Sequence, residues 1–335
     1  MNWRQLPLEE VADFCLGKML DQKKNRGELM PYLANINVRW GEFDFENLRE
    51  MRFEPGEFER YGLKAGDIVM CEGGEPGRCA IWKEQVPGMM IQKALHRIRP
   101  REYLHSRFLY YSFLKKRKNN ELAGYFTGST IKHLPREKLA QVKLEIPPLS
   151  TQARIADILS AYDDLIENNR RRIALLEEAA RLLYREWFVR FRFPGHEHVR
   201  IIDGIPEGWE RRGLGECISF QSGGTPSKAK AEYWAGNVPW ISSGELTTMR
   251  VSTSQLNVTE EAVTEGSRYA EKDTILAVVR GMSLAKEFRV GVVSKRVCFN
   301  QDIKALVPDR GVEGLFLFHA LFDRRDEICQ RASQA

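Results

Sequence analysis

The stretch STQARIADILSAYDDLIENNRRRIALLEEAARLLYREWFVRF, residues 150–191, decides how this chain is organised. Apolar residues recur in it every three or four positions, which places them on one stripe of a helix. At about 1.5 Å per residue such a helix is about 60 Å long, far beyond an ordinary globular helix. Residues 150–192 are therefore predicted to form a coiled-coil-type spacer helix whose stripe another helix covers. The stripe comprises Ile155, Ile158, Tyr162, Leu165, Asn169, Ile173, Leu176, Ala180, Leu183 and Trp187.

Length and composition favour two folded domains. The chain has 335 residues, of which 43% are hydrophobic and 29% charged, values typical of a globular protein. No apolar run approaches the roughly 20 residues that span a bilayer, and the first residues do not open a signal peptide. We expect a cytoplasmic protein without membrane contact.

Metal and disulfide chemistry is not expected. The six cysteines are scattered and form no Cys-x-x-Cys pair, so reduced thiols are the better interpretation. His196-Glu197-His198 follows Pro194-Gly195 in a predicted linker, where a solvated turn is favoured over a metal site. The sequence predicts no bound metal.

The chain carries an internal duplication. A shift of about 205–210 residues brings four landmarks into register in the same order, which indicates a repeated domain. The matches are residues 30–33 with 238–241, 66–69 with 272–276, 91–95 with 300–306, and 108–111 with 316–319.

Each repeat is expected to be an α+β domain. Short β-branched runs separated by glycine-rich turns come first and helical patterns come late, which is typical of twisted, largely antiparallel sheets with added helices. The predicted order is a first domain at 1–149, the spacer helix at 150–192, a linker at 193–208 and a second domain at 209–335.

No catalytic motif stands out. The chain has no Gly-x-x-x-x-Gly-Lys phosphate loop, no Gly-x-Gly-x-x-Gly after a strand and no Gly-x-Ser-x-Gly elbow. An enzyme whose catalytic carboxylates are scattered along the sequence is a further, less favoured hypothesis for the function. The net charge of +5 is small, and the basic runs, including residues 115–118, fit nucleic-acid contact or a solvated helix face equally well.

Two loops have the chemistry of nucleic-acid contact. The segment 222–228 (SGGTPSK) combines bare backbone amides, hydroxyls and a cation that can meet phosphates, and 127–133 (TGSTIKH) is similar. The alternative for the first is a β-turn next to core tryptophans, and core is the preferred reading for Trp234 and Trp240. The alternative for the second is a simple connection between helix and strand.

At these residues the chain resembles a known family. Ser222-Gly223-Gly224-Thr225-Pro226, with residues 238–242 (VPWIS), is similar to the opening of a target recognition domain in the specificity subunit of Type I restriction-modification systems. Gly128-Ser129-Thr130, followed by the Pro147-Pro148 and Gln152 pattern, resembles the end of such a domain and its spacer helix. The resemblance covers nearly the whole chain.

The resemblance implies a subunit that is not an enzyme and has no catalytic residues. Each of two recognition domains would read one part of a split target in double-stranded DNA, and helices would hold the parts apart and dock two methyltransferase subunits, which restriction subunits then join. S-adenosylmethionine, ATP and Mg are then expected in the partner subunits, with no cofactor bound by this chain.

The second repeat departs from that pattern. It matches the first only to about Phe316, so a counterpart of residues 128–191 is missing. The chain therefore resembles a C-terminally truncated subunit with an incomplete second domain and no second spacer helix. Self-association through the spacer helix is one consequence. A regulatory or structural subunit that binds methyltransferase without productive split-site recognition is the alternative function.

The candidate DNA-binding residues are polar or cationic loop residues near the matched landmarks. In the first repeat they are Asn35, Asn37, Arg39, Gly73, Gly74, Arg78, Lys93, Ser129, Lys132 and His133. In the second they are Gly223, Gly224, Thr225, Lys228, Ser242, Ser243, Arg280 and Ser283.

Overall fold

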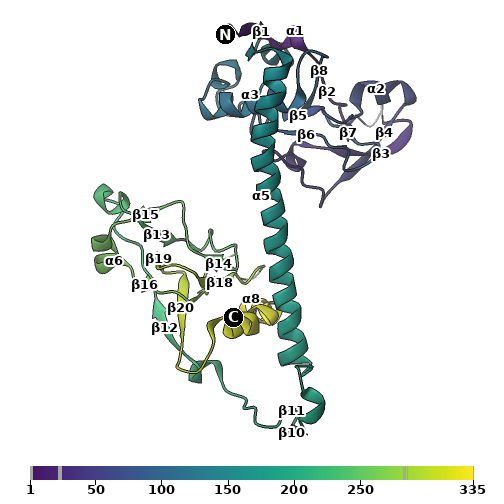
Figure 1. Ribbon diagram of the computed structural model, residues 1–335. Coiled ribbons are helices and arrows are strands. Elements are labelled where there is room, and N and C mark those ends of the chain that lie inside the picture. Colours follow the sequence, from purple (N-terminus) through teal and green to yellow (C-terminus); the bar gives the residue numbers. More distant parts are fainter. Residues whose placement is uncertain (1–2, 22–24, 282–283, 285, 335) are drawn as a thin grey trace. The chain divides into compact units, whose positions relative to one another are not determined.

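The computed structural model describes residues 3–21, 25–281, 284 and 286–334. Its contacts divide the chain into two compact units, unit 1 (Met1–Asn169) and unit 2 (Arg170–Ala335), and the boundary falls within one long helix. That helix, α5 (Leu149–Tyr184), runs without a break for 36 residues (Figure 1), about 54 Å at the usual rise. One π-helical turn, Arg185–Val189, continues it. The expected long helix is confirmed.

Two sheets and several short helices form unit 1. The larger sheet has the order β2-β8-β5-β6 and is antiparallel throughout, and the smaller has the order β4-β3-β7 with a parallel β3-β7 pair. Their strands are β2 (Ala12–Leu16), β3 (Glu28–Leu33), β4 (Arg49–Phe53), β5 (Ile68–Cys71), β6 (Cys79–Ile81), β7 (Met90–Ile91) and β8 (Leu95–Pro100). A separate pair joins β1 (Arg4–Pro7) to β9 (Lys143–Ile146).

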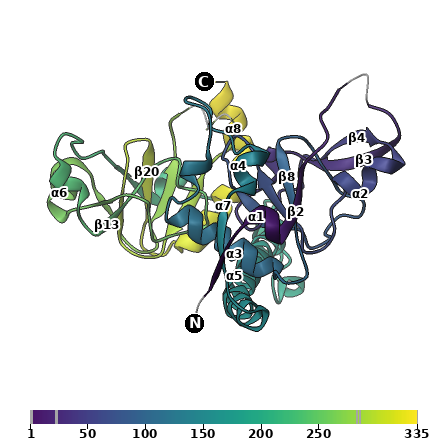
Figure 2. The same cartoon turned by 90° about the horizontal axis from the view of Figure 1, so that it is seen from above.

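The short helices of unit 1 pack on its sheets. They are α1 (Leu8–Val11), α2 (Phe58–Tyr61), α3 (Ser106–Lys118) and α4 (Arg136–Ala140). Helix α2 packs on the smaller sheet through Phe58 and Tyr61. Seen from above in Figure 2, α1 lies next to β2. Phe108, Leu109 and Phe113 of α3 belong to one buried cluster with Ile68 and Ile98 of the sheet. Burial of these side chains, about 1.5–3 kcal/mol each, holds the layer together.

Unit 2 repeats this plan. Its larger sheet has the order β12-β20-β17-β18-β14 and its smaller sheets join as β15-β13-β19-β16. The strands are β12 (Ile218–Ser222), β13 (Val238–Ile241), β14 (Arg250–Val251), β15 (Asn257–Val258), β16 (Tyr269–Ala270), β17 (Ile275–Val278), β18 (Val290–Val293), β19 (Val297–Phe299) and β20 (Ile303–Pro308). The helices are α6 (Glu260–Gly266), α7 (Gly314–Asp323) and α8 (Arg325–Ser333).

The shared strand order establishes the duplication structurally. The order β2-β8-β5-β6 corresponds to β12-β20-β17-β18, and β4-β3-β7 corresponds to β15-β13-β19, including one parallel pair in the same place. The expected α+β class with largely antiparallel sheets is confirmed. In the residues predicted as a linker, β10 (Ile201–Ile202) and β11 (Ile205–Pro206) form a small hairpin.

Helix α5 docks on unit 1 through a face that is both polar and apolar, since Ala156 belongs to the core cluster of the unit and Ile155 packs against it. Gln152, Ala156 and Ser160 are its buried residues there. The Gln152 amide accepts a hydrogen bond from the His105 backbone N–H at 2.9 Å and donates to the carbonyls of Tyr103 (3.1 Å) and Pro147 (2.9 Å). This face, spaced i, i+4, i+8, is what anchors the helix.

The end of α5 packs on α7 within unit 2. The Tyr184 ring lies 5.7 Å from Phe316 and stacks on His319 at 5.8 Å, and Phe188 meets Phe316 edge to face at 4.9 Å. Arg185 Nε is 3.2 Å from an Asp323 carboxylate oxygen. Helix α7 is therefore fixed to the end of the long helix by aromatic contacts.

Most of the predicted stripe lies on a different face from these contacts, although Ile155 packs against the core of unit 1. Ile158, Tyr162, Leu165, Ile173 and Leu176 are each 53–68% exposed. Leu183 is also exposed, Asn169 is solvent-facing, and Ile155, Ala180 and Trp187 are half-buried. Covering of the stripe by another helix stays a prediction, since within the described residues the stripe is largely open to solvent.

Candidate nucleic-acid interface

One end of the larger sheet in unit 1 gathers four loops. The carboxyl ends of β2 and β5 meet the amino end of β8 there, because Leu16 pairs with His96 and Cys71 pairs with Leu95. The loops after β2, after β5 and before β8 therefore emerge close together, and the loop after β3 joins them because Gln92 N–H donates to the Leu33 carbonyl at 3.0 Å. Most of the predicted residues of the first repeat lie on these loops.

Backbone hydrogen bonds tie the loops to one another. Lys18 N–H donates to the Ile91 carbonyl at 3.0 Å, and Lys93 N–H donates to the Lys18 carbonyl at 2.9 Å. Glu72 N–H donates to the Ala94 carbonyl at 2.9 Å. These bonds make the end of the sheet a preformed surface.

The glycine turn after β5 lies against the loop after β3. Gly74 has φ +79°, and a Cβ there would lie 3.1 Å from the Asn35 amide nitrogen. Arg78 donates to the Asn35 carbonyl at 2.8 Å and pairs with Glu75 at 3.2 Å, and its side chain is only 17% exposed. The two terminal guanidinium nitrogens of Arg78 thus hold this turn.

A short hairpin, residues 127–133, joins the same surface. Thr127 and His133 exchange two backbone hydrogen bonds of 2.8 and 2.9 Å, and His133 forms a β-bridge with Gly73. Gly128 has φ +92°, and a Cβ there would lie 2.2 Å from the Ile131 carbonyl oxygen, so glycine is required. The His133 ring is 3.2 Å from the Glu72 carboxylate.

The base of the hairpin is anchored in the core. Leu134, which is fully buried, donates its N–H to the Glu72 carbonyl at 2.7 Å. Its carbonyl accepts a 2.8 Å hydrogen bond from His96 Nε2. Burial lowers the pKa of His96, which favours the neutral ring with its proton on Nε2.

The predicted residues of unit 1 differ in availability. Asn37 is 3% exposed, and its amide bonds the Ala34 N–H and the Asp44 carbonyl, so it has a structural role. Gly73 is buried as well. Asn35, Arg78 and His133 are half-buried, whereas Arg39, which pairs with Asp44, and Gly74, Lys93, Ser129 and Lys132 are exposed.

Unit 2 builds the same sheet end from its own residues. A Cβ on Gly223 would lie 2.3 Å from the Phe299 carbonyl oxygen, and one on Gly224 would lie 2.2 Å from the Gly266 carbonyl oxygen. Gly224 N–H donates to Phe299 O at 2.9 Å, and the Trp240 indole donates to Gly224 O at 3.0 Å. The glycine pair is thus needed for close backbone packing.

The preferred core reading of Trp240 is confirmed, because this side chain is 6% exposed. Trp234 is partly buried and meets it edge to face at 5.2 Å. The polar loop and its aromatic neighbours are therefore parts of one structure, with tryptophans inside and hydroxyls and cations outside.

Three predicted residues of unit 2 are partly engaged within the unit. The Thr225 hydroxyl donates to the Gln301 side chain at 2.6 Å, and the Ser242 hydroxyl donates to Glu245 at 2.8 Å. The Ser243 carbonyl accepts from Arg289 at 3.3 Å. Lys228 and Arg280 are exposed, and Ser283 lies outside the described residues.

Glu245 organises the loop that carries Ser242. Burial raises the pKa of its carboxyl, but hydrogen bonds from Gln255, Ser242 and Ser254 outweigh burial and leave that pKa below its ordinary value. The Gln255 N–H bond is 2.7 Å long. A charged Glu245 therefore stabilises this loop at neutral pH.

Gly17 is a residue that the candidate list missed. A Cβ on Gly17 would lie 2.4 Å from Ile91 O and 2.5 Å from Gln92 O, and one on Gly223 lies equally close to Phe299 O and Asn300 O. The two glycines occupy the same place, directly after β2 and β12. The sequence carries a signal for Gly17, because it matches Gly223 at the shift of about 205–210 residues that relates the two repeats.

The basic run of α3 is largely neutralised. Lys115 pairs with Glu145 at 3.2 Å, Lys116 with Glu121 at 2.8 Å, and Arg117 with Glu75 at 2.7 Å. Of the two readings of this run, ion pairing within the unit explains these three residues.

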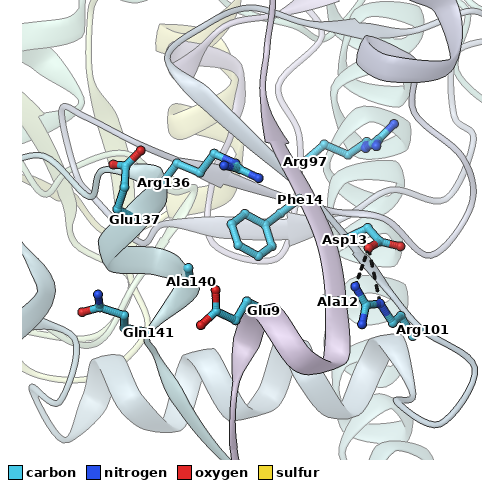
Figure 3. A pocket seen from close by; sticks show the side chains of 10 residues that line it. All are labelled: Glu9, Ala12, Asp13, Phe14, Arg97, Arg101, Arg136, Glu137, Ala140 and Gln141. Atoms are coloured by element: carbon cyan, nitrogen blue, oxygen red, sulfur yellow. Dashed lines mark hydrogen bonds and ion pairs between the residues drawn. The ribbon is translucent and has the colours of Figure 1, made fainter.

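A separate hollow of about 430 Å³ lies beside β2 and α4 (Figure 3). The Phe14 ring stands in it under Arg136, whose guanidinium is 5.2 Å from the ring centre, and Arg101 is paired with Asp13 at 2.9 Å. Three arginines and three carboxylates balance in its lining, and none of the predicted residues lies there. In the described part of the chain, no three His, Cys, Asp or Glu side chains gather as metal ligands, and no helix is long and apolar enough to cross a membrane.

Comparison with known proteins identifies the family. The model of the Type I restriction modification DNA specificity domain matches residues 1–178 and 206–333. The chain belongs to this specificity family. Each of the two matched segments contains a different one of the two sheet ends described above.

Two similar proteins are themselves named as specificity subunits of Type I restriction enzymes. The specificity subunit of the Type I restriction enzyme MjaIX of Methanocaldococcus jannaschii is 30% identical over 234 residues, which is 68% of this chain and 53% of that protein. The specificity subunit of EcoR124I/EcoR124II from Escherichia coli is 33% identical over 127 residues, 37% of this chain and 31% of that protein. The chain thus spans about half or less of the length of these relatives.

The fold is also shared with a solved structure. The S subunit of a Type I restriction-modification system from M. genitalium superposes with a TM-score of 0.56 at 18% identity, covering 99% of this chain and 80% of that one. This likeness concerns the fold.

Proposed function

We propose that this chain is the DNA-recognition subunit of a Type I restriction-modification complex, and that the equivalent sheet ends of units 1 and 2 each read one part of a split duplex target. Membership of the specificity family supports the proposal. The observation that carries it is the same glycine-packed sheet end, built twice from different residues and bordered each time by exposed polar and cationic loops.

Phosphate contacts fall to the exposed cations. Lys93 and Lys132 border the site in unit 1, and Lys228 and Arg280 border it in unit 2. Among the residues the structure describes, none of the four has an ion-pair partner. Cations that are not already neutralised can replace condensed counterions on DNA, which is the main source of affinity.

The bond-making chemistry is assigned to other subunits. S-adenosylmethionine, ATP and Mg would bind the methyltransferase and restriction subunits, while this chain supplies sequence recognition in the cytoplasm. The absence of a recognisable catalytic motif in the sequence supports this division.

The test is selection of bound duplexes from a random-sequence library by the purified full chain, followed by binding at several salt concentrations. Enrichment of a defined sequence is expected, and Lys93→Ala and Lys132→Ala should each lower the slope of log K against log salt by about 0.9. Lys143→Ala is the matched control, because Lys143 is exposed and lies on β9 opposite Pro7 of β1, which leads through α1 to the amino end of β2, away from the site. A folded chain that enriches no sequence would contradict the proposal.

The exposed stripe of α5 is proposed as the surface that docks the methyltransferase subunits. Its apolar residues repeat at the spacing of a coiled-coil seam, and Ile158, Tyr162, Leu165, Ile173 and Leu176 are exposed. A second copy of this chain is the competing occupant, through the same stripe.

A pair of variants tests this surface. Ile173 lies on the stripe and Leu175, two residues on, lies about 200° around the helix, yet they are 55% and 61% exposed. Ile173→Glu should abolish co-purification with the methyltransferase subunits, and Leu175→Glu should preserve it. Retained co-purification of Ile173→Glu would remove the stripe as a docking surface, and sedimentation of the chain alone would show whether self-association depends on Ile173.

A further inference from the structure

An apolar side chain stands at the tip of the hairpin of residues 127–133. Ile131 is 66% exposed, more than any other large apolar side chain described in unit 1 outside α5. Its hairpin is closed by the Thr127–His133 bonds and anchored by buried Leu134. The base of the hairpin is therefore fixed, while the Ile131 side chain at its tip stays exposed to solvent.

The surroundings of Ile131 are cationic and polar. Lys132 is adjacent in the chain, and Lys93 is brought to the same surface because the Glu72 backbone bonds Ala94 on one side and Leu134 on the other. The Asn35 side chain lies at Gly74, next to the Gly73–His133 bridge. An apolar tip bordered by unpaired cations and an amide is complementary to a polyanion with both apolar and hydrogen-bonding features.

The major groove of duplex DNA has those features. Its edges display the 5-methyl group of thymine together with donors and acceptors, and the phosphates run along both sides. The minor groove presents no methyl group. An aliphatic tip next to Lys132, on the surface that also carries Lys93, thus fits a thymine methyl with neighbouring phosphates.

We propose that Ile131 is a specificity-determining residue that contacts the 5-methyl group of one thymine in the major groove, with Lys93 and Lys132 on the neighbouring phosphates. This inference rests on the proposed function, since it names the feature of DNA that unit 1 reads. The hairpin of residues 127–133 would then contact the DNA bases directly, and the His133–Glu72 contact would hold the hairpin in position.

The test replaces each thymine of the selected duplex, one at a time, by deoxyuridine, which lacks only the 5-methyl group. At one position the full-length chain should bind roughly fourfold more weakly, the amount expected for one buried methyl. Ile131→Ala should bind the thymine duplex roughly tenfold more weakly and lose the discrimination at that same position. Ile131→Val should retain most of it, which separates contact from misfolding.

The matched control is Ile201→Ala, because Ile201 is a 57% exposed isoleucine on the small hairpin of unit 2. It should bind both duplexes as the unaltered chain does. Selective binding with no thymine whose replacement effect depends on Ile131 overturns this inference alone. Failure of the chain to select any sequence overturns it together with the proposed function, and an Ile131→Ala defect confined to methyltransferase association would assign the tip to a protein partner instead.

Discussion

Replacement of Gln152 by methionine should loosen the attachment of α5 to unit 1. The side chain is 1% exposed and makes three hydrogen bonds, accepting from His105 N–H and donating to the carbonyls of Tyr103 and Pro147. Methionine has a similar length but cannot make these bonds. The variant therefore removes hydrogen bonding without creating a large cavity.

The expected cost follows from the three lost bonds. At about 1 kcal/mol net for each bond, local stability should fall by about 3 kcal/mol. Every 1.4 kcal/mol is a factor of ten, so amide exchange through local opening should become roughly 150-fold faster. Hydrogen exchange with mass spectrometry on the full chain should show this in peptides covering residues 103–106 and 149–160.

Asn168→Ala is the control, since Asn168 is an exposed amide on the same helix. It should leave exchange in both peptides within threefold of the unaltered chain. If Gln152→Met also changed exchange there by less than threefold, the reasoning that this amide anchors the helix would be refuted.

Two further predictions concern the sheet ends. Gly17→Ala and Gly223→Ala should each lower the free energy of unfolding by about 2 kcal/mol in urea titrations. The control is Gly215→Ala, where an added Cβ would meet no atom within 4 Å, and it should change that free energy by under about 0.5 kcal/mol. Equal effects at all three positions would refute the packing argument. Because the pKa of Glu245 is lowered, its carboxylate stabilises the folded state above the ordinary value of 4.5 and that contribution is lost as the pH falls below it. The stability gap between the unaltered chain and Glu245→Gln should therefore narrow from pH 7 towards pH 3, and a gap independent of pH would contradict it.

The sequence predicted the architecture because duplication and periodicity are carried by many residues. Landmarks such as residues 30–33 and 238–241 fall on equivalent strands, β3 and β13. The long helix was also visible, since its pattern continues over ten turns. Fold class and family follow from such distributed signals.

The packing face of α5 was not predictable from the apolar pattern. The helix is anchored on unit 1 by Gln152 and Ser160 together with Ala156, while the stripe from Ile158 to Leu176 stays exposed. A periodic pattern of hydrophobic residues indicates that one face of a helix is covered, but it does not indicate which element or molecule covers that face. Hydrogen bonds from a side chain to the backbone carbonyls of Tyr103 and Pro147 produce no periodic pattern of residue types in the sequence.

The candidate residues show a similar limit. Asn37 and Arg78 are polar loop residues, but both form hydrogen bonds to the backbone of neighbouring loops. Residue spacing does not reveal which polar groups a loop uses internally. The sequence does not mark Ile131, since an apolar residue is not an obvious nucleic-acid contact. Its exposure at a fixed hairpin tip became evident only from the three-dimensional arrangement.

Mapping of methylated bases in the genome of a host that expresses this chain together with its methyltransferase subunits tests the central claim most directly. Two reading units predict a methylated motif with two specified blocks separated by an unspecified gap, and Lys132→Ala should weaken modification at that motif. A single uninterrupted motif, or no motif beyond that of a host without this chain, would contradict the account.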